Sequence, residues 1–343
     1  MARVRVGVNG FGTIGKRVAE AVKLQPDMDL VGVVKTKPDF GAFYAVRAGI
    51  PLYVPRDRLE SFEKAGVKVS GTVEDLLAKV DVIVDATPNG TGAKYKPLYE
   101  KFNVKMLFQG GEKADVAEVS FNTLCNFDQA LGKRSIRVVS CNTTALLRAI
   151  CTIGRHIPVR RVRATIVRRA ADPKEVKKGP INSIVPNPPE MPSHHALDVK
   201  TVLPDLDIVT AAVVVPTTLM HVHVVYAELE KEVRKDDLVA VFEQAPRILL
   251  ASADTGLAST ASLVEFARDL GRKRNDIQEL IIWEESVQAW GKEVAWMQAV
   301  HQESIVVPEN IDAIRAALEL AQSAEETIKI TDERLGLLRG RIP

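Results

Sequence analysis

Residues 4–18 read Val-Arg-Val-Gly-Val-Asn-Gly-Phe-Gly-Thr-Ile-Gly-Lys-Arg-Val. Apolar residues alternate at positions 4, 6 and 8, as in a strand, and recur at helical spacing at positions 14, 18 and 22. Between the two patterns, Gly10, Gly12 and Gly15 match the G-x-G-x-x-G turn, which lets the backbone and a helix amino terminus approach a pyrophosphate. A second strand at residues 30–34 completes a βαβ unit, so we predict a dinucleotide-binding site.

The rest of the chain divides into two parts that differ in the length of their predicted strands. Short strands are predicted at residues 80–84, 104–108 and 136–139, and each is followed by a polar or glycine-bearing loop of the kind that binds ligands in an open parallel sheet. After about residue 140, longer β-rich stretches replace the short ones, and a proline-rich loop spans residues 170–204. We therefore predict an α/β protein. A Rossmann-type doubly wound parallel sheet is followed by an α+β domain with a mostly antiparallel sheet.

Composition excludes several classes of protein. Of the 343 residues, 46% are hydrophobic and 26% are charged, which is typical of a globular chain of about two domains. The formal net charge of +2 provides no strong field for nucleic acid or an anionic membrane, and no apolar run approaches the ~18 residues of a membrane span. We expect a cytoplasmic protein. Cys125, Cys141 and Cys151 are an odd and sparse set that suits neither a disulfide framework nor a zinc site, so no metal is expected.

Cys141 has the setting of a nucleophile. It follows the predicted strand 136–139 and opens a helical stretch, where the helix dipole and free N–H groups would lower the pKa of its thiol. The two other cysteines are expected to be inert. A cysteine nucleophile needs a base within hydrogen-bonding reach. His221 and His223 point to the same face of a predicted strand, and each suits either this role or that of a buried core histidine.

Three further places suit anions or a substrate. An NAD site usually carries an acid about 20 residues after the glycine turn, but this position reads Lys35-Thr36-Lys37. A lysine there attracts a 2′-phosphate, so we predict that NADP is accepted and preferred; the alternative is an exposed basic turn without a ligand. Arg168 and Arg169 end a predicted strand, where an arginine could clamp a phosphate. His194 and His195 lie in the proline-rich loop, where substrate contact competes evenly with simple exposure.

Four motifs together resemble the archaeal branch of phosphorylating glyceraldehyde-3-phosphate dehydrogenase. They are VNGFGTIGKRV (8–18), SCNTT (140–144), PTTLMHVH (216–223) and HQESIVVPEN (301–310). The resemblance runs nearly end to end. The bacterial and eukaryotic branch instead has Cys-Thr-Thr-Asn after its serine and an acid at the end of its second strand, so its rules for base position and NAD preference are not carried over.

The resemblance implies an enzyme of glycolysis or gluconeogenesis. It would oxidise D-glyceraldehyde 3-phosphate, with inorganic phosphate, to 1,3-bisphosphoglycerate, as a thioester forms on Cys141 and a hydride passes to NADP or NAD. His221 would be the base. The residues implied to contact the substrate are Ser140, Asn142, His194 and His195. The residues expected to bind the cofactor are Gly10, Gly12, Thr13, Ile14, Lys35, Thr36, Gly111, Arg169 and Gln302.

The resemblance also bears on domains and assembly. It implies a homotetramer, and a final helix within residues 303–343 that rejoins the dinucleotide-binding domain 1–139. Residues 140–302 would form the catalytic and substrate domain. An apolar stripe over residues 308–326 predicts that this final helix is amphipathic.

Two alternatives remain open. A related Cys/His aldehyde or acyl-phosphate reductase, such as aspartate-semialdehyde dehydrogenase, would share the fold, the cofactor and the thioester chemistry. A non-catalytic NADP-binding regulator would need no reactive cysteine. Oxidation of glyceraldehyde 3-phosphate that depends on phosphate or arsenate distinguishes the favoured function from both.

Overall fold

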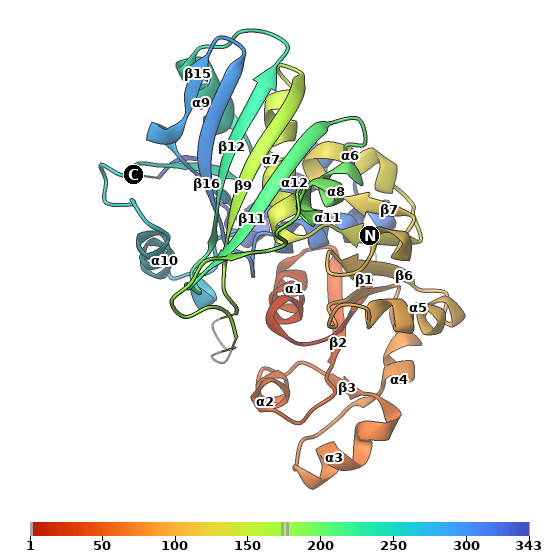
Figure 1. The fold of residues 1–343 in the computed structure, drawn as a ribbon. Helices are drawn as coiled ribbons and strands as arrows, with labels where there is room; N and C mark the ends of the chain where they lie inside the picture. Colours follow the sequence, from red (N-terminus) through yellow and green to blue (C-terminus); the bar gives the residue numbers. More distant parts are fainter. Residues whose placement is uncertain (1–2, 173–174, 176–177, 343) are drawn as a thin grey trace. The chain divides into compact units, whose positions relative to one another are not determined.

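The computed structural model describes residues 3–172, 175 and 178–342. The chain forms two compact units (Figure 1). The first comprises Met1–Val139 and Val307–Gly336, and the second comprises Ser140–Val306 and Leu337–Pro343. Within the described residues, no helix combines the length and the apolarity that a membrane crossing requires.

The first unit is built on a parallel sheet with the strand order β4-β3-β2-β1-β5-β6-β8-β7. The order runs outward from β1 in both directions, which is the doubly wound arrangement that the sequence predicts. The strands are β1 (Val4–Asn9), β2 (Met28–Val34), β3 (Leu52–Val54), β4 (Gly71–Thr72), β5 (Val82–Asp85), β6 (Lys105–Gln109), β7 (Val119–Phe121) and β8 (Ser135–Val138). The helices between them are α1 (Thr13–Leu24), α2 (Phe40–Arg47), α3 (Leu59–Lys64), α4 (Val73–Leu77), α5 (Gly92–Lys101) and α6 (Thr123–Ala130).

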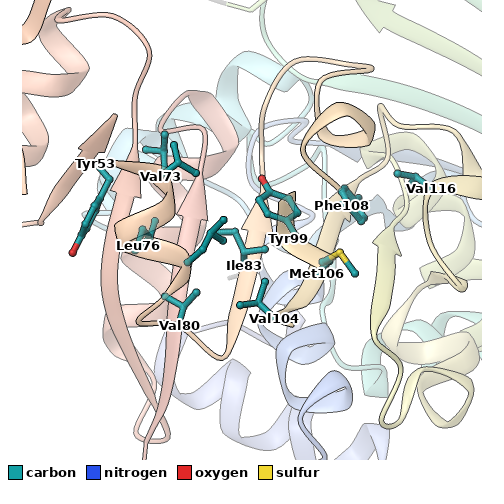
Figure 2. Packing of buried hydrophobic residues seen from close by; sticks show 12 residues of the cluster. Tyr53, Val73, Leu76, Val80, Ile83, Tyr99, Val104, Met106, Phe108 and Val116 are labelled. Atoms are coloured by element: carbon teal, nitrogen blue, oxygen red, sulfur yellow. The ribbon is translucent and has the colours of Figure 1, made fainter. Parts of the chain in front are cut away.

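A hydrophobic cluster joins this sheet to its helices (Figure 2). Leu76 of α4 and Tyr99 of α5 pack with Ile83 of β5 and with Met106 and Phe108 of β6, and all five side chains are buried. Strands that are covered on both faces are apolar along their whole length. This explains why the predicted strands appear in the sequence as short continuous apolar runs.

The carboxyl-terminal segment of this unit differs from the single amphipathic helix that the sequence predicts. It forms α11 (Val307–Ala317) and α12 (Ala324–Leu335), and every residue of α11 is buried. The reason is that α11 packs against α1, α6 and α12, so its polar side chains are paired inside the unit. Arg315 donates to both carboxylate oxygens of Asp27 at 2.8 Å and to the hydroxyl of Thr331 at 2.6 Å.

The second unit contains a mixed sheet with the strand order β10-β11-β9-β12-β16-β14-β13-β17, with β15 paired to β16. Its centre, β9-β12-β16-β14, is antiparallel, as predicted for an α+β domain, and parallel pairs flank it. The strands are β9 (Val159–Arg169), β10 (Val185–Pro186), β11 (Asp207–Val215), β12 (His221–Leu229), β13 (Ile248–Ala251), β14 (Leu280–Trp283), β15 (Gln288–Trp290), β16 (Glu293–Val300) and β17 (Gly340–Arg341). The helices are α7 (Cys141–Gly154), α8 (His194–Lys200), α9 (Lys235–Gln244) and α10 (Thr260–Asp269).

The segment 170–204 is not a continuous loop. It contains β10 and α8, and α8 packs against α7 and β11. His194 and His195, which the sequence places in the loop, therefore form the first turn of a helix. Residues 173–174 and 176–177 of this segment lie outside the described residues.

Candidate active site

The first turn of α7 carries the predicted nucleophile. Ser140 caps the helix, because its hydroxyl accepts a hydrogen bond from the backbone N–H of Thr143. The hydroxyl of Thr143 donates to the carboxylate of Asp198 on α8 at 2.6 Å. Cys141 is the first residue of α7 and is the free cysteine of the described chain. The capped helix end therefore fixes the backbone that carries its thiol.

Asn142, the next residue of α7, is held between two histidines. Its Oδ1 lies 2.9 Å from Nε2 of His223 on β12, and its Nδ2 lies 3.1 Å from Nε2 of His195 on α8. The other ring nitrogens are also bonded, to Gln298 in His223 and to Ser193 in His195. His195, His223 and Asn142 are all buried, so none of the three lies at an open surface. His194, by contrast, is exposed.

His221 has one bonded ring nitrogen and one that stands without a partner. The backbone N–H of Arg169 donates to Nδ1 at 2.9 Å. Nε2 is buried, and no hydrogen-bond partner for it occurs among the described residues. Burial, with added repulsion from His223, Arg169, Arg168 and His195, lowers the pKa of His221 well below its usual value, so the ring is neutral. Because Nδ1 accepts a hydrogen bond, the ring proton lies on Nε2.

The two arginines at the end of β9 differ. Arg169 is buried, and its guanidinium contacts Asp172, Glu303 at 2.7 Å and Oε1 of Gln302 at 2.6 Å. Its charge is therefore balanced by carboxylates. Arg168 is only partly buried, and its Nη1 donates to Asn187. Of the two arginines that the sequence offers as a phosphate clamp, Arg168 is thus the more accessible.

In the first unit the three glycines have separate structural roles. Gly10 has φ +98°, the left-handed region that glycine tolerates. A Cβ on Gly15 would lie 1.7 Å from the carbonyl oxygen of Gly10, so Gly15 is needed where α1 packs on the turn. A Cβ on Gly12 would meet no described atom within 4 Å. The space over Gly12, beside the first N–H groups of α1 at Thr13 and Ile14, therefore fits a pyrophosphate.

The loops after β5 and β6 are fixed close to this turn. The hydroxyl of Tyr99 donates to Asp85 at 2.5 Å, and the backbone N–H of Thr87 donates to the same carboxylate at 3.0 Å. Burial raises the pKa of Asp85, although the hydrogen bonds from Thr87 and Tyr99 oppose this. A Cβ on Gly111 would lie 2.0 Å from Oδ1 of Asn89, so a larger residue here would displace the exposed side chain of Asn89.

Two lysines gather at the amino terminus of α2. A Cβ built on Gly41 would lie 3.2 Å from Nζ of Lys35 and 3.3 Å from Nζ of Lys16. Lys16 also lies over the ring of Phe40, 4.5 Å from its centroid. Asp39 caps α2 by accepting from the N–H groups of Gly41 and Ala42, and it pairs with Lys35 at 2.8 Å. Spacing along the sequence does not point to Lys16, because it lies in α1, away from the position where cofactor preference is usually determined.

The predicted cofactor residues fall into both units. Gly10, Gly12, Thr13, Ile14, Lys35, Thr36 and Gly111 belong to the first, at the carboxyl ends of β1, β2 and β6. Arg169 and Gln302 belong to the second, where they are bonded to each other. All of the predicted catalytic and substrate residues also belong to the second unit. They are Ser140, Cys141, Asn142, His194, His195 and His221.

Known proteins show extensive similarity to this chain. A relative named glyceraldehyde-3-phosphate dehydrogenase, from Hyperthermus butylicus, is 76% identical over the full length of both chains. The chain belongs to the glyceraldehyde-3-phosphate dehydrogenase family. Relatives of the same name from Saccharolobus islandicus and Sulfurisphaera tokodaii are 59% and 56% identical, each over at least 98% of both chains. The resemblance deduced from the four motifs is thereby confirmed.

Two family models and a solved structure also match this chain. Residues 140–283 match the C-terminal domain of glyceraldehyde 3-phosphate dehydrogenase, and residues 4–108 match the N-terminus of dihydrodipicolinate reductase. The crystal structure of aspartate semialdehyde dehydrogenase II from Vibrio cholerae superposes with a TM-score of 0.66 over 93% of this chain and 98% of that one. At 13% identity, this likeness shows the shared fold alone.

Cysteine chemistry in this member of the glyceraldehyde-3-phosphate dehydrogenase family departs from the sequence analysis in two ways. Cys125 and Cys151 are disulfide-bonded, so the expectation of a chain without disulfides is wrong. The expected lowering of the Cys141 pKa is also wrong. Burial raises the pKa of this thiol to about 11, and Arg169, Arg168 and the N–H of Asn142 offset only part of the rise. Removal of the thiolate from water destabilises it more than the helix end and the two arginines stabilise it.

The pKa of Cys141 predicts how fast it is alkylated. Only the thiolate reacts, so the rate of alkylation by iodoacetamide should rise about tenfold per pH unit through the neutral range, without levelling off below about pH 9. Mass spectrometry of the Cys141 peptide at a series of pH values measures this rate, with Cys141→Ser as the blank. A rate that is already constant above pH 7 would contradict the raised pKa.

The glycine turn provides a matched pair of variants. Gly15→Ala should destabilise the protein by about 1–3 kcal/mol, because the new methyl group overlaps the carbonyl of Gly10. Gly12→Ala should change the free energy of unfolding by less than about 0.5 kcal/mol, because its Cβ enters open space, yet it should weaken cofactor binding. Thermal unfolding and fluorescence titration with NADPH measure the two effects. Equal losses of stability in both variants would argue against these separate roles.

Proposed function

We propose that this chain catalyses the phosphorylating oxidation of D-glyceraldehyde 3-phosphate to 1,3-bisphosphoglycerate. The observation that carries the proposal is a free cysteine, Cys141, on the capped first turn of α7, in a segment that matches the C-terminal domain of this enzyme family. Full-length relatives that bear the name of this enzyme support it. We also propose that the first unit binds the dinucleotide and that the second binds the substrate.

The proposed chemistry begins at the sulfur of Cys141. The thiol releases its proton to water, and the thiolate attacks the aldehyde carbon, so that the carbonyl oxygen becomes an oxyanion. A bound nicotinamide ring supplies a hydride acceptor for the hydrogen on that carbon. The carbon is left as a thioester of Cys141. An oxygen of inorganic phosphate then attacks the thioester, the thiolate departs, and the acyl phosphate is released.

His221 fits the role of a hydrogen-bond donor in this sequence. Its Nδ1 accepts from the backbone N–H of Arg169, so the neutral ring carries its proton on Nε2. To accept a proton at Nε2, the ring would first have to release the one that it holds. We therefore propose that Nε2–H stabilises the oxyanion, in place of the base role that the sequence suggests. An oxyanion that is stabilised in this way loses a hydride without a separate deprotonation.

The phosphate step tests the proposed function. Reduction of the cofactor by glyceraldehyde 3-phosphate should be continuous in phosphate or arsenate, and should stop after acylation of Cys141 when both anions are absent. Stopped-flow absorbance of the reduced cofactor distinguishes these cases. Equal steady-state rates without either anion would indicate a non-phosphorylating enzyme. Turnover of aspartate semialdehyde in preference would indicate the related reductase, and binding of NADP without turnover of either aldehyde would indicate a regulator.

Replacement of His221 distinguishes a donor from a base. His221→Ala should lower kcat by about 10²–10³-fold, which is the usual effect of removing one oxyanion donor. His221→Gln keeps an N–H donor but cannot take up a proton, so it should retain at least about tenfold more activity than the alanine variant. Steady-state kcat at several pH values measures the difference. If the two variants are equally inactive, His221 acts as the base.

We propose that NADP is preferred over NAD. Nζ of Lys35 and Nζ of Lys16 both lie next to Gly41, where a 2′-phosphate would also meet the N–H groups of α2. The carboxylate of Asp39 is already used as the cap of α2 and as the partner of Lys35, so it is poorly placed to bind a ribose hydroxyl. Burial raises the pKa of Asp39, but its bonds to Lys35, Ala42 and Gly41 outweigh this and keep it ionised.

The charge at residue 35 should determine this preference. Lys35→Asp should lower kcat/KM for NADP relative to NAD by about 10- to 100-fold, because hydrogen bonds between charged groups contribute about 1.5–3 kcal/mol each. Lys37→Asp, with the same change of charge at an exposed neighbour, is the control and should leave the ratio close to that of the wild type. An unchanged ratio in Lys35→Asp would refute the 2′-phosphate site.

Assembly and location complete the proposal. We propose a cytoplasmic homotetramer, on the basis of the four-motif resemblance to the family. Sedimentation velocity of the purified chain measures the assembly state.

A further inference from the structure

A chain of buried hydrogen bonds runs through the second unit behind the nucleophile. It begins at the indole of Trp296 on β16 and passes through Gln298, His223, Asn142, His195 and Ser193 to Thr210 on β11. Every one of these side chains is buried. The described bonds of the chain are 2.7–3.1 Å long. A buried network of this kind is stable only when each donor meets an acceptor, so its direction can be deduced.

Trp296 sets the direction of the chain. An indole N–H can only donate, and it donates to Oε1 of Gln298 at 2.8 Å. The amide nitrogen of Gln298 must then face Nδ1 of His223, which lies 3.0 Å away on the paired position of β12. An amide nitrogen can only donate, so Nδ1 of His223 accepts. The proton of this neutral ring therefore lies on Nε2.

The same reasoning carries through α7 to α8. Nε2–H of His223 donates to Oδ1 of Asn142, so the amide nitrogen of Asn142 faces Nε2 of His195 and donates to it. The proton of His195 then lies on Nδ1 and is donated to the hydroxyl of Ser193 at 3.1 Å. The two histidines on either side of Asn142 are thus fixed in opposite tautomers.

The chain ends at a group that can only accept. The hydroxyl of Ser193 donates to that of Thr210 at 2.7 Å, and Thr210 donates to the backbone carbonyl of Ser193 at 3.3 Å. Thr210 also accepts from the backbone N–H of Ala196 at 3.1 Å. One end is therefore an obligate donor and the other is a carbonyl oxygen. Protonation of His195 or His223 would place two donors face to face. Burial already opposes it, since it lowers the pKa of His195 to about 2 and that of His223 to about 3.

We propose that Gln298 and His223 are positioning residues, which orient the amide of Asn142 and so fix the first turn of α7 and its nucleophile, Cys141. Both side chains are buried. His223 accordingly has no part as an acid or a base, since both of its ring nitrogens are hydrogen-bonded to residues of this network. The catalytic effect of this arrangement rests on the function proposed above, whereas the pattern of tautomers does not.

The tautomers themselves are the first test. In the full chain labelled with ¹⁵N-histidine, long-range ¹H–¹⁵N correlation spectra distinguish protonated from unprotonated ring nitrogens, and single-histidine variants assign the signals. Near neutral pH, His223 should carry its proton on Nε2 and His195 on Nδ1. The same tautomer in both rings, or a second proton on either, would overturn the proposal without reference to activity.

Gln298→Glu is the second test, because an ionised glutamate has nearly the same shape as glutamine but can only accept. One oxygen can still accept from Trp296, but the other requires a proton on Nδ1 of His223. The ring must then either move its proton from Nε2 to Nδ1 or take up a second proton. In the first case Nε2 becomes an acceptor, so the amide of Asn142 must flip to present its Nδ2 to it. In either case kcat should fall about 10- to 100-fold. KM for the cofactor should stay unchanged, because none of the predicted cofactor residues belongs to this hydrogen-bond chain.

The controls separate positioning from general damage. Gln288→Glu introduces the same charge on β15, the neighbouring strand, and should retain wild-type kcat. Gln298→Met removes the donor to His223 without adding an acceptor; it should give mixed tautomers and a smaller loss of kcat than glutamate does. If either variant at Gln298 folds with altered tautomers yet keeps wild-type kcat, the positioning role is refuted. If the wild-type tautomers are as deduced but the enzyme oxidises no aldehyde, the proposed function fails and the hydrogen-bond chain stands.

Discussion

The side chain of Asn142 is the contact on which the second unit depends. Its two amide atoms join β12, through His223, to α8, through His195. The residue lies on the first turn of α7, directly after Cys141. A hydrogen-bonded amide at this point holds a strand, a helix and the backbone of Cys141 in one arrangement, so a small movement of any one of them is opposed by the other two.

Burial governs the chemistry around this contact. It holds the neighbouring histidines neutral and raises the pKa of the thiol, while Arg168 and Arg169 pull that pKa in the opposite direction. Asp172 and Glu303 balance much of the charge of Arg169. The site therefore combines few net charges with many oriented dipoles. Oriented dipoles in a water-excluded site need little reorganisation as charge develops, which is the arrangement that favours reactions through an oxyanion.

The sequence predicts the parts of this molecule that depend on local patterns. The strand-turn-helix at residues 4–18, the helix that opens at Cys141 and the shared face of His221 and His223 all follow from spacing, and the structure contains each of them. Features that depend on distant partners could not be found in this way. Three features depend on residues that are far apart in the chain. They are the position of the Lys16 ammonium beside Gly41, the raised pKa of Cys141 and the tautomer of His221. An odd number of cysteines is also compatible with disulfide-bonded cysteines and one free thiol. The count of three cysteines therefore could not exclude a disulfide.

The carboxylate of Asp39 has two functions. One oxygen caps α2, and the other holds the ammonium of Lys35. If the acid were lost in evolution, Lys35 would be freed for the proposed 2′-phosphate, but α2 would lose its cap. If the acid is kept, α2 keeps its cap, but the acid would compete with that phosphate for Lys35. Drift at this position is therefore constrained by both helix stability and cofactor affinity. Lineages that replace Asp39 should retain serine, threonine or asparagine there, since these residues cap a helix without carrying a charge.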